Sequence, residues 1–63
     1  MNTARETSLS LRAALAVLDA EGFGENAMLA IVGQLKAAGL IKQNAFQGAS
    51  VMLSDLQAAM RSL

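Results

Sequence analysis

The chain has 63 residues, 54% of them hydrophobic, and its five Lys and Arg residues balance five Asp and Glu residues. A chain of this length forms one domain, and chains below about 70–80 residues usually need disulfides, a metal ion or association for stability. The absence of Cys excludes disulfides and thiolate metal sites, and the absence of His leaves only carboxylates as metal ligands. We therefore expect a single domain, residues 1–63, that forms a homodimer and holds no metal ion or cofactor.

The composition also limits the classes of function. Without His or Cys the chain lacks the usual nucleophiles and general bases, so we do not expect an enzyme. Zero net charge is a weak electrostatic footprint for nucleic acid, although a dimer presents each cation twice. Phe23 and Phe46 are the only aromatic residues, which argues against binding single strands by stacking. The sequence shows no signal peptide and no apolar run of about 20 residues, so we expect a cytoplasmic protein.

The first seven residues form a short polar segment. A frayed terminus is the simplest interpretation of such a segment. The alternative is a short extended strand within these seven residues, whose alternation places Thr3, Arg5 and Thr7 on one face. The other face holds no large apolar residue, so this strand would need a partner from another subunit.

A first helix is predicted from about residue 8 to residue 21. Leu11, Leu15 and Leu18 recur at helical spacing, and the Ser and Thr residues before them are suitable N-caps. Gly22 predicts the end of this helix, because glycine readily adopts the left-handed conformation that follows many helices.

The second helical pattern, which ends before Gly39, is too apolar for the surface of a monomer. A surface helix needs one apolar stripe, whereas apolar residues here extend around most of the helix over residues 28–35. A chain this short cannot easily bury such a helix alone, so we expect a second subunit to cover it. The predicted dimer interface consists of Met28, Leu29, Ile31, Val32 and Leu35.

Residues 40–53 have apolar ends and a polar centre that contains Phe46. They form either a hairpin or a linker, and we favour a linker because their alternation is poor. Ser54 and Gln57 then have the spacing of a capping box, which predicts a short third helix. Its apolar stripe consists of Leu53, Leu56, Met60 and Leu63. Because so short a helix is marginal alone, we expect it to pack on the first two helices, with a protein partner as the alternative cover.

The turn and second helix resemble a known family. The segment EGFGENAMLAIV, residues 21–32, is similar to the turn and second helix of ribbon-helix-helix proteins, which are small dimeric repressors and antitoxin DNA-binding domains. The resemblance covers residues 2–40 and implies a mainly α dimer, in which a short N-terminal strand, here residues 2–6, pairs with its twofold mate before two helices. Residues 41–63 add a loop and a short C-terminal helix. An all-α helical bundle dimer is the alternative fold.

The resemblance also implies a function. Such a protein is a transcriptional repressor or antitoxin-like regulator that reads the major groove of double-stranded DNA with its N-terminal ribbon. Thr3, Arg5 and Thr7 are then the residues that face the bases, and Arg12 and Lys36 are phosphate contacts. In antitoxins that resemble this chain, the segment after the DNA-binding domain holds the toxin, which makes the C-terminal stripe a candidate partner surface.

Two other interpretations remain open. The segment QLKAAGLI, residues 34–41, looks like the end of a recognition helix that enters a wing, as in winged-helix proteins. Against that interpretation, the second helix is uninterrupted and no short helix precedes it. The other interpretation is a small helical protein-interaction module without DNA binding, which suits the zero net charge and the lack of catalytic groups.

Overall fold

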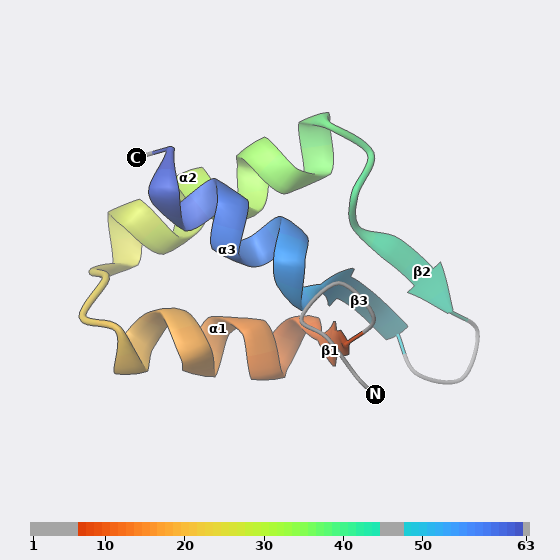
Figure 1. Ribbon diagram of the computed structural model, residues 1–63, viewed down its shortest axis with the longest axis horizontal. Coiled ribbons are helices and arrows are strands. Elements are labelled where there is room, and N and C mark those ends of the chain that lie inside the picture. The colour runs from red at the N-terminus through yellow and green to blue at the C-terminus, as the bar shows by residue number, and fades with distance from the viewer. Residues whose placement is uncertain (1–6, 45–47, 63) are drawn as a thin grey trace.

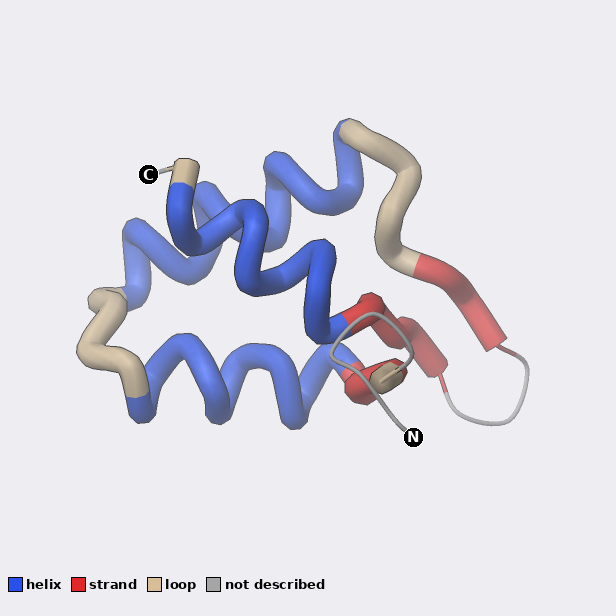
Figure 2. Tube along the Cα trace, viewed as in Figure 1, coloured by secondary structure: helices blue, strands red, loops and turns tan. Residues whose placement is uncertain are grey.

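The computed structural model of the protein describes residues 7–44 and 48–62. Within these residues the chain forms three helices and a short three-stranded antiparallel sheet, so the fold is mixed and the all-α bundle is wrong (Figures 1 and 2). In chain order the elements are β1 (Ser8–Ser10), α1 (Leu11–Ala20), α2 (Glu25–Ala37), β2 (Lys42–Asn44), β3 (Gly48–Met52) and α3 (Leu53–Arg61). The strand expected over residues 2–6 lies outside the described residues.

The sheet lies at one end of the molecule and the α1–α2 turn at the other. Figure 1 shows α1 running from the sheet to the turn and α2 returning toward the sheet. α3 begins where β3 ends, packs on α2 and β3, and finishes beside the turn. We call these two ends the sheet end and the turn end. None of the three described helices has the length and hydrophobicity needed to span a bilayer.

α1 begins later than the sequence suggested. The helix starts at Leu11, because Ser8–Ser10 pair with β3 as a strand, with Ser8 opposite Met52. Ser10 then caps the helix, and its hydroxyl accepts a hydrogen bond from the Ala13 amide at 3.1 Å.

The two glycines predicted to end helices are confirmed in that role. Gly22 has a φ of 92°, and the Phe23 amide donates to the Leu18 carbonyl at 3.1 Å, which is the long hydrogen bond of a Schellman motif. α2 ends in the same way at Gly39, where φ is 74°. The apolar residue after each glycine packs back against the core, as this motif favours.

Lys42–Asn44 and Gly48–Met52 are paired strands of a hairpin rather than parts of the linker that we favoured. β2 and β3 pair antiparallel, with Lys42 opposite Ser50. β3 is the central strand of the sheet because its other edge pairs with β1, where Leu9 lies opposite Val51. The hairpin therefore depends on a third strand from the other end of the chain, which its local alternation does not reveal.

α3 begins one residue before the expected cap. The Leu53 amide opens the helix and donates to the Thr7 carbonyl at 2.8 Å, because β3 runs directly into α3 beside the N-terminal segment. Ser54 therefore lies inside the helix, and the capping box is wrong. The expected packing is confirmed, since Leu56 is fully buried and Ala59 is nearly so.

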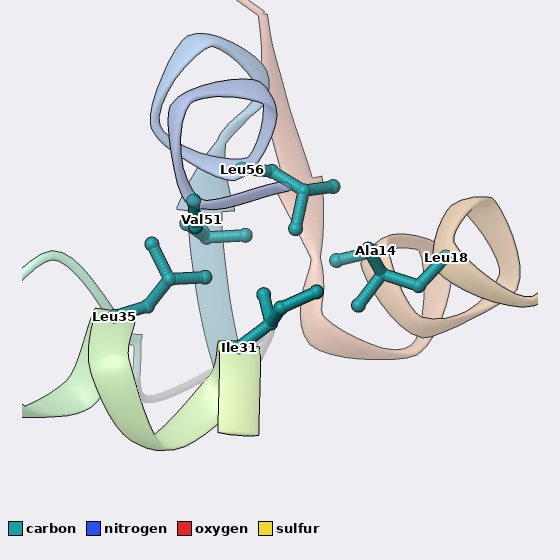
Figure 3. Close-up of a cluster of buried hydrophobic side chains, with 7 residues drawn as sticks. Ala14, Leu18, Ile31, Leu35, Val51 and Leu56 are labelled. Carbon is teal, nitrogen blue, oxygen red and sulfur yellow. The ribbon is translucent and has the colours of Figure 1, made fainter. Parts of the chain in front are cut away.

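One apolar core joins all three helices to the sheet. It consists of Ala14, Leu18, Ile31, Leu35, Val51, Leu56 and Ala59. Figure 3 shows the side chains from α1, α2, β3 and α3 pointing toward one another. In the C-terminal stripe, Leu53 and Met60 are partly buried against this core, whereas Leu63 lies outside the described residues.

The fold divides the expected dimer interface into two sets. Ile31 and Leu35 are 0% and 2% exposed inside a single chain, so they have no surface left for a second subunit and their assignment is corrected. Met28 and Val32 are half-buried, and Leu29 is 65% exposed. The chain buries α2 more fully than its length suggested, because α1, α3 and β3 all contribute to one core.

Candidate nucleic-acid interface

The polar chemistry of the described residues lies at the surface. None of their polar or charged side chains is buried, and no buried side-chain nitrogen or oxygen among them lacks a hydrogen-bond partner. No group of three Asp or Glu side chains in the described part is arranged to hold a metal ion. An open hollow of about 400 Å³ lies where α3 meets the turn, and it is lined by Glu21, Phe23, Gln57, Met60 and Arg61.

Charge is distributed unequally between the two ends of this neutral chain. The sheet end carries three exposed cations and one half-buried acid, which are Arg12, Lys36, Lys42 and Asp55. The turn end carries three exposed acids and one exposed cation, which are Asp19, Glu21, Glu25 and Arg61. The described residues are therefore polarised, with the positive side at the sheet.

Two of these cations lie at the sheet or at the start of the helix that follows it. Ser10, Ser50 and Lys42 lie opposite one another in a single row across all three strands. Because side chains alternate between the faces of a sheet, this row points away from Val51 and the core. Two strand spacings separate Ser10 from Lys42, which is about 10 Å, and Arg12 follows Ser10 in the first turn of α1. The outer face of the sheet thus carries Lys42 at one edge, and Arg12 lies at the start of the helix that continues from the other edge.

Three of the five predicted DNA contacts lie within the described residues. Thr7 is half-buried just before β1, and its carbonyl accepts the hydrogen bond from Leu53. Arg12 and Lys36 are exposed on different helices, both toward the sheet end. The predicted residues Thr3 and Arg5 lie outside the described residues.

Sequence reasoning missed Lys42 as a member of this surface. The residue lay in the segment that we interpreted as a linker, where a lysine has no defined direction. Lys42 shares a surface with Arg12 only through the pairing of both outer strands with β3. The poor alternation of residues 40–53 hid that pairing.

The outward face of α2 has a different character. Leu29 is the most exposed large apolar residue of the described part, and Gly33 follows one turn later. A Cβ added at Gly33 would meet nothing within 4 Å, so packing within the chain does not explain this glycine. Glu25 and Lys36, which are both exposed, lie in the first and last turns of the same helix.

Comparison with known proteins gave no match. No family model, curated protein or solved structure is significantly similar to this chain.

Proposed function

We propose that the chain binds duplex DNA as a homodimer and acts as a repressor or antitoxin-like regulator. The observation that supports this proposal best is the concentration of exposed cations at the sheet end of a neutral chain. Phosphate contacts supply most of the sequence-independent affinity of DNA-binding proteins, and their effect depends on where the cations lie. Arg12 and Lys42, beside the outer face of the sheet, are the proposed phosphate contacts.

Base reading is assigned to the N-terminal segment. Thr7 leads directly into β1, so the segment that carries Thr3 and Arg5 joins the fold at the positive end. In this proposal residues 2–6 pair with the same residues of the second copy, and the two-stranded ribbon enters the major groove. Arg5 then donates to guanine, and the two threonine hydroxyls serve as donors or acceptors to base edges.

The helix–turn–helix also allows a winged-helix version of the proposal. α1 and α2 are joined by a short turn, the β2–β3 hairpin follows α2, and β1 completes the sheet. In that version the outer face of α2 would enter the groove and the hairpin would be the wing. The N-terminal version is preferred because Glu25 at the start of α2 would repel phosphates and Leu29 offers no hydrogen bond.

The salt dependence of DNA binding tests the phosphate contacts. Fluorescence anisotropy with a labelled duplex should give an affinity that falls linearly with salt on logarithmic axes. Each lost phosphate contact lowers the slope by about 0.9, so Arg12→Ala or Lys42→Ala should lower it by roughly 2 when both copies lose the residue. Arg61→Ala, at the turn end, is the matched control and should leave the slope unchanged. The same loss in Arg61→Ala, or no binding by the wild type at low salt, contradicts the proposal.

A protein-interaction module without DNA binding is the second candidate. The exposure of Leu29 favours it, because an exposed leucine on a helix can serve as an apolar anchor in a partner's groove. A wild-type protein that associates through this face but shows no salt-dependent DNA binding would place this function first.

A further inference from the structure

Leu29 and Gly33 form a knob and a notch on the outward face of α2. Each lies two residues, or about 200° around the helix, from the buried Ile31, so both point away from the core. They are four residues apart and therefore adjacent on the surface. Leu29 presents a large side chain that is 65% exposed, and Gly33 leaves open space beside it.

The chain's own fold gives no reason for the glycine. A glycine inside an exposed helix destabilises it by about 1 kcal/mol relative to alanine. Gly33 has no positive φ, and no neighbouring atom lies within 4 Å of where its Cβ would be. Glycine in such a place permits another backbone or side chain to approach closely.

We propose that a second copy of this chain packs antiparallel on the outward face of α2. In a twofold antiparallel pair, residues at equal distances from the centre on either side face each other. When the twofold axis crosses α2 at the height of Ile31, Leu29 of each copy enters the notch at Gly33 of the other. The glycine allows the two helix axes to approach to the lower end of the usual range, about 8 Å.

The charges on α2 favour a second copy of the chain as the partner and an antiparallel orientation of the two helices. Glu25 and Lys36 are about three helical turns apart, so they lie above one another on the same flank of the helix. A twofold antiparallel pair brings each flank against the same flank of the other copy. Glu25 of one copy then lies within about 1.5 Å, measured along the axis, of the position of Lys36 in the other. The dimer gains an ion pair at both ends, and the two helix dipoles oppose each other favourably.

This inference concerns a contact between two copies that is separate from the N-terminal ribbon of the proposed function, and it requires no DNA contact. It replaces Ile31 and Leu35, which are buried, with Leu29 and Gly33 as the centre of the interface. Because the helices are antiparallel, the two positive sheet ends lie toward opposite ends of this α2 dimer, so the two copies that it joins are not the two that an N-terminal ribbon would pair. Lys36 therefore serves the dimer, whereas Arg12 and Lys42 remain available for phosphates.

Charge reversal in the full chain without DNA tests the arrangement. Sedimentation equilibrium over micromolar to millimolar concentrations gives the dimer dissociation constant. Glu25→Lys and Lys36→Glu each place like charges together at both ends and should each weaken the dimer about tenfold. The double variant restores both pairs and should dimerise like the wild type. Both reversals oppose the helix dipole, so a gain in helix stability cannot explain recovery in the double variant.

The notch is tested by a substitution that also raises the helix propensity of α2. Gly33→Gln fills the notch and should weaken the dimer at least tenfold, while raising the melting temperature of the diluted monomer by a few degrees. Leu29→Ala should weaken the dimer to a similar extent. Leu15→Ala, a partly exposed leucine on α1, is the matched control and should leave dimerisation unchanged.

Three results would overturn the inference. They are a wild-type monomer at millimolar concentration, a double charge reversal as weak as the single ones, and unchanged dimerisation of Gly33→Gln. A wild-type monomer that still binds DNA would leave Arg12 and Lys42 as phosphate contacts, each substitution then lowering the slope by about 0.9, although the homodimer of the proposed function would be lost as well.

Discussion

Leu56 is the residue that ties α3 into the core, and its truncation is expected to remove most of the stability of the fold. The side chain is fully buried between α1, α2 and β3 (Figure 3). Replacement of a buried leucine by alanine costs about 3–5 kcal/mol, because the apolar contacts are lost and a cavity remains. A domain of this size has a total stability of about 3–9 kcal/mol. Leu56→Ala should therefore remove a large share of the free energy of unfolding.

The magnitude can be measured by thermal unfolding followed by far-ultraviolet circular dichroism at a fixed protein concentration. For a domain this small, each kcal/mol corresponds to about 4–8 °C, so Leu56→Ala should melt at least about 12 °C lower than the wild type or fail to fold. Leu56→Met conserves the volume and should cost less than about 1.5 kcal/mol, which keeps the comparison measurable if the alanine variant is unfolded.

The matched control is Leu15→Ala on α1. Leu15 is 38% exposed and lies outside the buried core, so its truncation should cost clearly less than that of Leu56. Equal melting temperatures for Leu56→Ala and Leu15→Ala would refute the reasoning. That result would mean that α3 does not share a core with α1 and α2 in solution.

Two further predictions concern the glycines and the N-terminus. Gly22→Ala should lower the free energy of unfolding by about 1–2 kcal/mol in urea titrations, because φ at this position is 92°; an unchanged midpoint would argue against the Schellman ending of α1. If residues 2–6 form the proposed intermolecular ribbon, hydrogen exchange should show protected amides there at concentrations where the protein is dimeric. Fast exchange would remove the ribbon from the DNA-binding proposal.

Parts of this fold could be predicted because the signals are local. The ends of α1 and α2 follow from Gly22 and Gly39, since a left-handed residue closes each helix with its own carbonyls. The third helix and its packing follow from an apolar stripe that must be covered. The start of α1 was displaced, because Ser8 and Ser10 suit a helix cap as well as a strand, and only pairing with β3 decides between the two.

The candidate surfaces could be predicted only in part, for the same reason. Arg12 and Lys36 were identified as exposed cations, but Lys42 joined them only when β2 paired with β3. Leu29 was identified as an interface residue within a set that also included Ile31 and Leu35. A nearly continuous apolar helix does not reveal which of its sides turns inward, because that depends on where the other elements lie.

The sequence by itself determined the single small domain, two glycine-terminated helices, a third helix that needs cover, and the absence of His and Cys. These features depend on composition and on interactions within one or two turns of chain. Only the tertiary structure decided that β2 and β3 join a sheet with β1, that Ile31 faces the core while Leu29 faces outward, and that most cations of the described residues lie at one end. Each of these depends on contacts between segments far apart in sequence, and the free energy of such contacts cannot be read from a local sequence pattern.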